Sequence, residues 1–437
     1  MTIIVIGLGY VGLTTALTFA HQGKRVIGVD IDEERIIMLD NGRLPIHEEG
    51  LDDILFQTLG KEFTVTSDLG SVVAAADTFF ICVDTPTGDD GRINLHSIEN
   101  VARNLGRHFK DLDSFKTVVV KSTVIPGTTR HITKIIEEVS GKRAGQDFGI
   151  AMIPEFLREG RALRDALDPD RIVIGCEDPS VCEHLSGLFN NYNCPTVEVS
   201  LETAEFSKYA SNSFLALKIS FANELANIID IFNSRDSSSR ASISDVVEIM
   251  GLDSRINPAF LGAGIGFGGS CFPKDVKALA SFSEDLGYHA RLLRGTLDVN
   301  ESQPNRAVEL LEEELGDLAG KRITVLGLAF KPDTDDVREA PSLKIISELV
   351  KKGSRVQTWD PVAEQHVKNL YPDIIYYDHL QESLTGIDGA IIATEWSDII
   401  NYLERCGDYP FVLIDGRGVV PRATRSIGQP NLRDCGT

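Results

Sequence analysis

A glycine-rich stretch past the middle of the chain carries the side chains best suited to chemistry. Cys271 is followed three and four residues later by Lys274 and Asp275, just before a helical pattern. A nearby lysine and a helix N-terminus both lower the pKa of a thiol, so this spacing favours a thiolate nucleophile. Most glycine-rich loops are only flexible linkers, however, and the spacing alone leaves that interpretation of residues 262–269 open.

The N-terminal segment has the residues of a dinucleotide site. A β-branched run, Ile3–Ile6, precedes a G-x-G-x-x-G pattern, and a helical stretch and a second strand follow it. Gly7 permits a tight turn, Gly9 lets the backbone approach a pyrophosphate, and Gly12 lets the helix pack closely on the strand. The second strand ends at Asp30, whose carboxylate would accept hydrogen bonds from ribose hydroxyls and repel a 2′-phosphate. The pattern predicts NAD rather than NADP.

Arg35 lies five residues after Asp30 and bears on this choice of cofactor. A guanidinium near the ribose would attract a 2′-phosphate and blur the preference that Asp30 sets. A solvated arginine on a helix surface explains the same residue equally well.

Candidate site residues, most of them polar, also follow each of the next predicted strands, the first of which ends in Asp84-Thr85-Pro86. Ligands of doubly wound sheets bind beyond the carboxyl ends of the strands, so these positions are candidates for contact with a cofactor or substrate. They lie within the segments 76–86, 115–129 and 147–160, and they are Thr85, Pro86, Ser122, Thr123, Glu155 and Glu159.

The elements that must position these residues fall into three stretches. Residues 1–200 alternate strands and helices and predict a doubly wound NAD-binding domain. Residues 201–315 are helical, and the first helix, 201–232, has more apolar positions than one amphipathic face needs, so we expect it to be buried in a dimer. The α/β pattern returns over residues 316–437, where the first turn keeps Gly327 but lacks the other two glycines, so we expect a different ligand there.

Composition excludes several classes of partner. The 437 residues carry a formal net charge of −22, which argues against nucleic acid or an anionic membrane as the main partner. No run approaches the ~20 apolar residues of a membrane span. The N-terminus lacks the basic region and cleavage site of a signal peptide, so we expect a cytoplasmic protein.

The seven cysteines are odd in number and include no C-x-x-C pair. This spacing favours neither a disulfide framework nor a zinc site, and we expect no metal. A reducing cytoplasm is consistent with that expectation.

Nine segments, spread in order along nearly the whole chain, are more specific than any single motif. They read GLGYVG, CVDTP, STVIPGT, PEFLREG, FSKYASNSFLALKISFANE, GLDSRI, GFGGSCFPKD, AFKPDTDDVREAPS and ATEW. Together they resemble the UDP-glucose/GDP-mannose dehydrogenase family. The FGGSCFPKD segment is most similar to the branch that oxidises UDP-glucose, since members acting on N-acetylated sugars tend to carry GGHC there. GDP-mannose and other UDP-hexoses or hexosamines remain alternatives.

The resemblance implies a fold and a reaction. The fold would be two Rossmann-like, doubly wound α/β domains joined by a long central helix and a helical dimerisation domain. The reaction would be an NAD-dependent, four-electron oxidation of the hexose 6-hydroxymethyl group, from UDP-glucose to UDP-glucuronate. Cys271 would attack the aldehyde to form a thiohemiacetal and then a thioester, and Glu159 would activate the hydrolytic water.

Proton transfer and charge stabilisation are implied for residues in other segments. Thr123 would position a water, held near Lys208 and Asp275, that takes the hydroxyl proton. Lys208 and Asn212 lie four residues apart on one helix face and would donate to the oxyanion. Glu155 would be a second active-site carboxylate that organises water. Without the resemblance, a solvated helix face explains Lys208 and Asn212 better.

Binding residues are implied in the same way. Those for the cofactor would be Gly7, Gly9, Tyr10, Val11, Gly12, Asp30, Arg35, Thr85, Pro86, Thr123, Glu159, Lys274 and Arg338. Those for the substrate would be Glu155, Phe156, Leu157, Arg158, Lys208, Asn212, Arg255, Phe267, Gly268, Phe330 and Lys331. Arg255 would reach the site of a partner subunit, which implies a homodimer, and Gly268 and Gly269 would let the backbone approach the hexose. A surface ion pair is the alternative for Arg338.

Four features depart from the family pattern. Ile153 replaces the Asn usual before PEF, Glu49 the Pro of E-P-G-L, and Gly418 the Asn of D-x-R-N. The polar, Ser-rich segment 233–240 lengthens a connection that is commonly shorter, and we expect it to be a mobile loop. None of these changes removes a catalytic group, but Ile153 and the longer connection bear on substrate fit and subunit contacts.

Two other function classes are weaker. A two-electron hydroxy-acid dehydrogenase would share the first strand-helix-strand unit but needs neither the GFGGSCFPKD nor the AFKPDTDDVR segment. A non-catalytic sugar-nucleotide binder would be expected to lose some of the catalytic candidates. All of them are present: Thr123, Glu159, Lys208, Asn212, Cys271 and Asp275.

Overall fold

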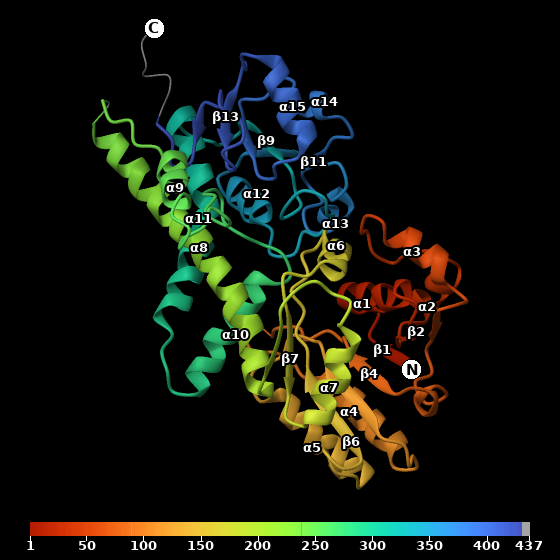
Figure 1. Cartoon of the computed structure of the whole chain (residues 1–437). Helices are drawn as coiled ribbons and strands as arrows, with labels where there is room; N and C mark the ends of the chain where they lie inside the picture. Colours follow the sequence, from red (N-terminus) through yellow and green to blue (C-terminus); the bar gives the residue numbers. More distant parts are fainter. Residues whose placement is uncertain (89, 237, 431–437) are drawn as a thin grey trace. The chain divides into compact units, whose positions relative to one another are not determined.

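The computed structural model of the chain describes residues 1–88, 90–236 and 238–430. Figure 1 shows its helices and strands, coloured along the sequence. The chain divides into two compact units between Ser211 and Asn212, and this boundary falls within one long helix. The C-terminal sequence NLRDCGT, residues 431–437, predicts an unstructured tail, and it lies outside the described residues.

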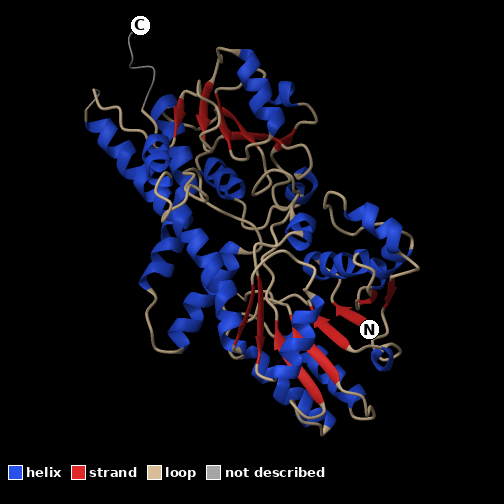
Figure 2. Ribbon diagram, in the orientation of Figure 1, coloured by secondary structure: helices blue, strands red, loops and turns tan. Residues whose placement is uncertain are grey.

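In the described part of the first unit, strands form an eight-stranded sheet (Figure 2) in the order β3-β2-β1-β4-β5-β6-β7-β8. The strands are β1 (Thr2–Ile6), β2 (Arg25–Val29), β3 (Phe63–Thr66), β4 (Thr78–Ile81), β5 (Lys116–Val120), β6 (Phe148–Met152), β7 (Ile172–Cys176) and β8 (Thr196–Val199). Within these strands only β6 and β7 pair antiparallel. The predicted doubly wound domain is confirmed, and the reversal at β7 is a feature that the sequence pattern did not indicate.

Helices cover both faces of this sheet. They are α1 (Tyr10–His21), α2 (Glu33–Asp40), α3 (Leu51–Thr58), α4 (His96–Phe109), α5 (Thr128–Ser140), α6 (Ala162–Leu167) and α7 (Pro179–Leu188), with a 3₁₀ turn at Val73–Ala75. Successive side chains of a strand point to opposite faces, so Ile3 and Val5 enter one apolar core while Ile4 and Ile6 enter the other. The β1 strand is therefore buried on both sides, which agrees with its continuous β-branched run.

The second unit repeats the same topology in a smaller sheet. In its described residues the strand order is β11-β10-β9-β12-β13-β14, and the paired strands are parallel. The strands are β9 (Arg322–Leu326), β10 (Arg355–Trp359), β11 (Ile375–Tyr376), β12 (Gly389–Ile392), β13 (Val412–Asp415) and β14 (Arg425–Ser426). The helices of this unit are α9 (Ile243–Gly251), α10 (Phe272–Asp285), α11 (Arg291–Leu315), α12 (Pro341–Lys351), α13 (Glu364–Lys368), α14 (Leu380–Ser383) and α15 (Ser397–Cys406). The second Rossmann-like fold is confirmed.

The long helix α8 (Leu201–Arg235) has 35 residues. It extends three residues beyond the predicted end, into the segment expected to be a loop. Asn233 explains the extension, because its amide donates to the carbonyl of Ala241 and accepts from the N–H of Ala241, which fastens the returning chain to the last helical turn. Within the described residues no helix has the length and apolar character needed to cross a membrane.

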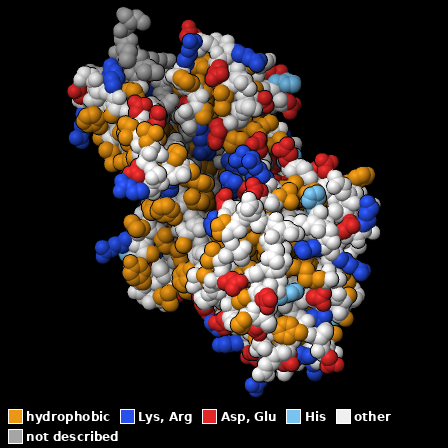
Figure 3. All heavy atoms as spheres, in the orientation of Figure 1, with side chains coloured by type: hydrophobic (Ala, Val, Ile, Leu, Met, Phe, Trp, Pro, Cys, Tyr) orange, Lys and Arg blue, Asp and Glu red, His pale blue; other side chains and the backbone are white. Residues whose placement is uncertain are grey.

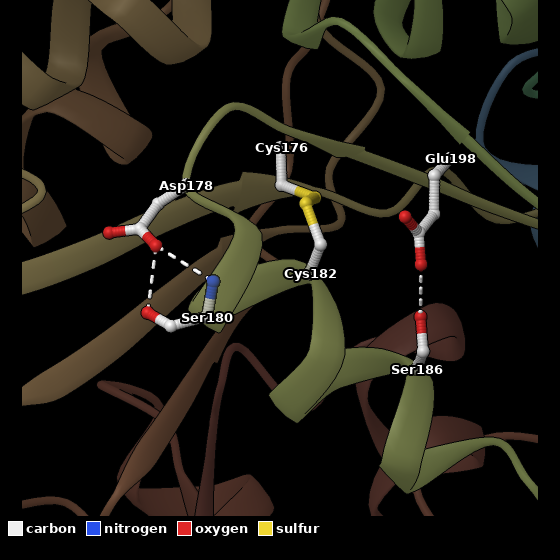
Figure 4. The surroundings of a disulfide bond; sticks show 6 residues. All are labelled: Cys176, Asp178, Ser180, Cys182, Ser186 and Glu198. Carbon is white, nitrogen blue, oxygen red and sulfur yellow. Dashed lines mark hydrogen bonds between the residues drawn. A yellow bond between two sulfur atoms is a disulfide. The ribbon is translucent and has the colours of Figure 1, made fainter.

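A disulfide joins Cys176, the last residue of β7, to Cys182 in α7 (Figure 4). The expectation that the cysteines form no disulfide is wrong for this pair. The bond follows from local geometry, because β7 runs directly into α7. Asp178 caps the helix by accepting from Ser180 N at 2.8 Å, which turns the chain back and brings the two cysteines together.

Candidate active site

The three glycines that follow β1 occupy their positions for different structural reasons. Gly7 has a φ of +91°, and a side-chain carbon on Gly12 would lie 1.8 Å from the Gly7 carbonyl oxygen, so internal packing requires both residues. A carbon on Gly9 would meet nothing closer than Asp84 Oδ1 at 4.0 Å. The space beside Gly9 is therefore open, and α1 begins at Tyr10 with a glycine N-cap that brings no side chain to its first N–H groups. This arrangement fits the pyrophosphate of a dinucleotide.

Asp30 lies at the end of β2 and is buried. Its Oδ2 accepts from Leu8 N at 2.7 Å and from the Arg35 guanidinium at 2.9 Å, while its Oδ1 accepts from Asp32 N. The structure thus places Arg35 against Asp30 rather than in solvent. The ion pair offsets part of the negative charge of Asp30 while leaving its carboxylate at the edge of the glycine turn.

Tyr10 belongs to a buried hydrogen-bond cluster that sequence reasoning missed. Its hydroxyl donates to the carboxylate of Glu48 and accepts from Gly160 N at 2.6 Å. Burial and the carboxylates of Glu48 and Glu159 raise the pKa of Tyr10 well above its ordinary range. Glu48 also accepts from Leu163 N, so it holds the end of the Glu155–Glu159 segment against α1. The burial of Glu48 beside the exposed Glu49 has no local sequence signal.

Residues after β4 and β5 hold one another in place. Thr85 Oγ1 donates to the carbonyl of Thr123 at 2.7 Å, and Ser122 Oγ donates to the carbonyl of Val83 at 2.7 Å. Pro86 is exposed beyond this contact, and its carbonyl accepts from Asn94 N. The predicted neighbours Thr85 and Thr123 therefore meet at the carboxyl edge of the sheet.

Glu155 and Lys208 form a buried ion pair. The Lys208 Nζ lies 2.7 Å from Glu155 Oε1, and the two side chains are 4% and 6% exposed. Burial alone would raise the pKa of Glu155, but the Lys208 ammonium, its hydrogen bond and the N–H of Leu157 together hold this pKa below its ordinary value. Burial lowers the pKa of the neighbouring Lys121. Lys208 is therefore not solvated. The solvated helix face, which explained this residue better without the family resemblance, is wrong for Lys208.

Phe156 and Arg158, in the same segment as Glu155, each contact a further charged residue. The Phe156 ring carries the Arg171 guanidinium 3.8 Å from its centroid and lies 5.8 Å from Lys208 Nζ. Arg158 is mostly exposed and binds Asp165 through both its side chain and its backbone N–H. The segment thus presents an aromatic face and backbone groups beside the Lys208 ion pair.

In the second unit the glycine-rich segment is buried and hydrogen-bonded, so the flexible-linker interpretation is wrong for its residues 264–269. Asn300 on α11 accepts from Phe267 N at 2.7 Å and donates to Phe267 O at 3.0 Å. Arg417 donates to the carbonyls of Gly266, Phe330 and Ala393. Sequence reasoning missed Asn300 and Arg417, because their partners are backbone groups far away along the chain.

Gly268 and Gly269 are packed against other parts of the second unit. A carbon on Gly268 would lie 2.4 Å from the carbonyl of Glu339, and one on Gly269, at φ +85°, would lie 2.8 Å from the Phe330 ring. Gly269 N donates to the carbonyl of Arg338 at 2.8 Å. The resemblance explained these glycines by the approach of a hexose, but internal packing already requires them.

Cys271 is exposed and forms the N-cap of α10, where the helix dipole favours a thiolate. Asp275, in the first turn, is 1% exposed. It accepts from Asn212 Nδ2 at 2.6 Å and from Lys274 Nζ at 2.6 Å. A nucleophile, a buried carboxylate and two donors are therefore brought together around one helix start, and Lys274 faces Asp275.

The other predicted basic residues of the second unit are more exposed. Arg255 is 87% exposed and bound to Asp253, and Arg338 is 66% exposed and bound to Asp336. The surface ion pair considered for Arg338 is thus present. Lys331 Nζ lies 5.4 Å from the centroid of the Phe330 ring.

The three residues that depart from the family pattern are explained by their degree of burial or their backbone conformation. Ile153 is buried in the apolar core of the first unit, and Glu49 is exposed. Gly418 has a φ of +70°, a conformation that glycine adopts freely and asparagine tolerates best among other residues. Glycine and asparagine are therefore near-equivalent at this turn.

Asp360 stands in the second unit where Asp30 stands in the first. Its carboxylate accepts from Leu328 N, Ala329 N and the Trp396 indole, as well as from Ala363 N. Both oxygens of this carboxylate accept hydrogen bonds from groups of the second unit. The arrangement agrees with the expectation that the second fold binds a different ligand.

Known proteins match the chain over nearly its whole length. The NAD binding, central and UDP binding domains of the UDP-glucose/GDP-mannose dehydrogenase family match residues 1–193, 202–302 and 324–422. A UDP-glucose 6-dehydrogenase of Haloferax volcanii is 42% identical over 97% of this chain and 98% of its own, and one of Bacillus subtilis is 39% identical over 99% and 94%.

Solved structures agree with these matches. A UDP-glucose dehydrogenase from Pyrobaculum islandicum has a TM-score of 0.89 and 40% identity, covering 97% of this chain and 96% of its own. A UDP-D-ManNAc dehydrogenase from Pyrococcus horikoshii has a TM-score of 0.86 and 29% identity, covering 99% and 100%. The chain therefore belongs to the UDP-glucose/GDP-mannose dehydrogenase family of NAD-dependent oxidoreductases.

Proposed function

We propose that this enzyme oxidises UDP-glucose to UDP-glucuronate with two equivalents of NAD. The relatives named for UDP-glucose are more similar to it than the solved relative named for an N-acetylated sugar, at 42% and 40% against 29% identity. The cysteine segment reads GGSC rather than GGHC. Both observations favour an unmodified hexose over an N-acetylated one.

The first oxidation removes the proton of the hydroxyl group on C6 of the glucose and a hydride from C6 itself. A water near Lys208 and Asp275 takes this proton, and Thr123 positions the water. NAD, when bound, accepts the electron pair of each oxidation as a hydride. The buried Glu155 keeps Lys208 charged, so that the lysine stabilises the alkoxide as it forms.

The second oxidation passes through Cys271. The thiolate attacks C6 of the aldehyde, and the resulting thiohemiacetal oxygen receives hydrogen bonds from Lys208 and Asn212. Loss of a second electron pair gives a thioester. A water activated by Glu159 then cleaves the C–S bond, which releases the carboxylate and the thiol. The covalent step keeps the reactive aldehyde from escaping.

One observation carries this proposal. Lys208 and Asn212 lie one helical turn apart on α8, and each already donates to a buried carboxylate, Glu155 and Asp275 respectively. A solvated helix face would leave these donors to water, whereas here each donor is buried and a carboxylate partner compensates its loss of hydration. Preorganised donors that need no rearrangement are what an oxyanion requires.

We extend the assignment to domains and ligands. The chain has an NAD-binding part (1–200), a helical part that holds the cysteine (201–315) and a UDP-sugar-binding part (316–437). The cofactor residues around Gly9 and the substrate residues around Phe156, Phe267 and Phe330 keep the roles that the family resemblance implies. The open space beside Gly9 and the position of the Phe156 ring beside Lys208 support these roles.

The decisive experiment measures NADH released per UDP-glucose consumed. Two equivalents support the proposal, and one equivalent would rule out the four-electron reaction. The same assay with GDP-mannose, UDP-N-acetylmannosamine and UDP-galactose, each with NAD and with NADP, decides the substrate and the cofactor preference. UDP-glucose with NAD should give the highest kcat/KM.

We also propose a homodimer formed through α8. In the second unit this helix exposes Phe214, Phe221 and Ile228 at seven-residue intervals, followed by Ile231 and Phe232. Hydrophobic side chains gather on the face of the molecule over α8 (Figure 3). Such a stripe on a soluble protein marks an interaction surface, and a repeating stripe suits a second copy of itself. Arg255, exposed in the isolated chain, would reach the partner's substrate.

Analytical ultracentrifugation tests the dimer. Phe221→Glu should convert it to a monomer, whereas Phe56→Glu, at an exposed phenylalanine of α3 in the first unit, should not. Mixing an Arg255→Ala variant with a Cys271→Ser variant should restore part of the activity if the arginine acts across the dimer. No restoration would assign Arg255 to its own subunit.

A cytoplasmic location is the last part of the proposal. The Cys176–Cys182 disulfide bears on it, because most cytoplasmic proteins keep their thiols reduced, although hyperthermophiles are an exception. Cell fractionation with thiol trapping before lysis reports both the compartment and the state of this pair. Recovery outside the cytoplasmic fraction would contradict the location.

A further inference from the structure

Glu205 on α8 is a buried carboxylate that the proposed mechanism does not use. Its side chain is completely buried. Its Oε2 accepts from Gly127 N at 2.6 Å, and its Oε1 accepts from Thr129 N at 2.7 Å and from Thr129 Oγ1 at 2.6 Å. Burial raises the pKa of Glu205, and the hydrogen bonds from Thr129 and Gly127 oppose that shift. A carboxylate placed at this cost needs an explanation.

The partners of Glu205 lie at the start of α5. The N-cap of this helix is Gly127, which has no side chain to receive the first N–H groups. Helices usually solve this problem with a Ser, Thr or Asp at the N-cap itself. Here a glutamate from a helix 76 residues further along the chain receives the N–H and the hydroxyl of Thr129.

The capped turn ends the loop that carries Thr123. Strand β5 ends at Val120 and α5 begins at Thr128, so Thr123 lies in the short connection between them. Thr85 fixes the carbonyl of Thr123, and Glu205 fixes the far end of the connection. The loop is thus held by the segment that follows β4 on one side and by α8 on the other.

Glu205 also lies three residues before Lys208 on α8. The two side chains point to different partners, since Lys208 binds Glu155 after β6 and Glu205 binds the start of α5. The first turns of α8 therefore fasten two sheet-edge segments at once. A shift of this helix would move the Thr123 loop and the Lys208 pair together.

We propose that Glu205 is a positioning residue, which sets the cofactor-side loop of Thr123 in register with the helix that carries Lys208. The inference rests on the proposed roles of Thr123 and Lys208. Its specific consequence for binding concerns NAD, because Thr85 and Thr123 are assigned to the cofactor, while Thr123 acts on the sugar only through the water that it positions. Loss of the cap should weaken NAD binding more than substrate binding.

The chain offers a matched control in Glu202, one turn earlier on α8. Its carboxylate binds Arg130 on α5, so it links the same two helices, but it is partly exposed and accepts no backbone N–H of the α5 start. A surface ion pair of this kind contributes little to stability. Glu202→Gln should therefore leave NAD binding unchanged.

The experiment measures the Kd for NAD by calorimetry, together with the KM values and the melting temperature. Glu205→Gln places an amide N–H against the donors of Thr129 or Gly127, so its Kd for NAD should rise about tenfold, with the KM for UDP-glucose changed less than about twofold. Thr129→Val, which removes one donor and its hydroxyl bond, should raise the Kd by about threefold, and Thr129→Ser should restore it.

An unchanged Kd for NAD in a folded Glu205→Gln protein with a lowered melting temperature would make Glu205 a stabilising residue only and overturn the inference. Equal losses of NAD and UDP-glucose binding would also overturn it. If Glu205→Gln does not fold, the difference between Thr129→Val and Thr129→Ser decides. Because Kd for NAD needs no turnover, failure of the proposed reaction in the wild-type enzyme would be seen separately.

Discussion

The Lys208 Nζ lies 2.7 Å from Glu155 Oε1, and both side chains are almost completely buried. Burial disfavours the charge on each group, and the opposite charge of its partner compensates part of that cost. The pair therefore connects the folding of the first unit with the charge that the mechanism needs on Lys208.

Glu155→Gln should destabilise the protein and change its dependence on pH. Breaking a buried ion pair costs about 3–5 kcal/mol, because it leaves one charge buried without its partner. The pKa of Glu155 is lowered in the folded state from an ordinary value of 4.5. Its stabilising effect is therefore fully present above about pH 5 and is lost as the pH falls through the folded-state pKa.

Urea unfolding at several pH values between about 3 and 7 checks this prediction. The wild type should lose stability on acidification more steeply than Glu155→Gln. Glu198→Gln, at an exposed carboxylate of the same unit, should follow the wild type. Parallel curves for wild type and Glu155→Gln would show that the ion pair does not contribute to acid sensitivity.

Cys271→Ser should separate the two oxidations. A serine hydroxyl is a far weaker nucleophile at neutral pH, so complete oxidation of UDP-glucose should fall by about 10³-fold or more. The first step should survive, because Thr123, Lys208 and Asp275 remain. The variant should therefore reduce added UDP-glucose aldehyde with NADH.

Cys406→Ser is the matched control, since Cys406 is also exposed and lies at the end of α15. Its activity should stay within about twofold of wild type. Rapid overall turnover by Cys271→Ser would remove the thiol from the mechanism.

Much of the fold was predictable because its signals are local. The glycine turn after β1, the helix stops and the repeated strand-helix-strand pattern depend on backbone conformation within a few residues. Gly7, Gly9 and Gly12 illustrate this, since two are required by packing and one leaves space for a ligand. The reversal of β7 had no such signal, because strand direction depends on where the chain returns.

The hydrogen-bond network that supports the site was not predictable, because its partners are distant along the chain and leave no local signal. Arg417 donates to the carbonyl of Gly266, 151 residues away along the chain, and Glu48 accepts from Leu163 N, 115 residues away. Backbone carbonyls and N–H groups are identical at every position, so sequence alone does not mark which of them need a partner. Burial decides this, and burial is a property of the folded chain.

Asn300→Ala should loosen the cysteine segment without affecting the cofactor. The substitution leaves the N–H and carbonyl of Phe267 without their partner, next to Gly266 at φ +94°. Because Cys271 follows four residues after Phe267, small displacements should lower kcat by about 10- to 100-fold. The Kd for NAD should not change.

Ser302→Ala, on an exposed position of the same helix, should leave kcat unchanged. Calorimetry and steady-state kinetics on the two variants check both statements. Normal kcat in Asn300→Ala would show that the segment keeps its conformation through Arg417 and the remaining packing alone.

The disulfide gives a prediction about stability. A bond that closes a loop as short as Cys176–Cys182 should contribute about 2 kcal/mol by restricting the unfolded chain. Cys182 lines a surface pocket of about 450 Å³, so a dithiol reductant should reach it without unfolding the protein. Reduction adds two electrons and two protons and leaves two thiols.

Alkylation in denaturant checks the bond directly, since protein unfolded without reductant should take up two fewer labels than reduced protein. Cys182→Ala should lower the melting temperature under oxidising conditions, and the difference from wild type should shrink when both proteins are reduced, because only the wild type then loses a cross-link. A difference that persists unchanged after reduction would assign the effect to packing of the Cys182 side chain instead. Cys406→Ala, at an exposed thiol, should show no redox-dependent difference from wild type.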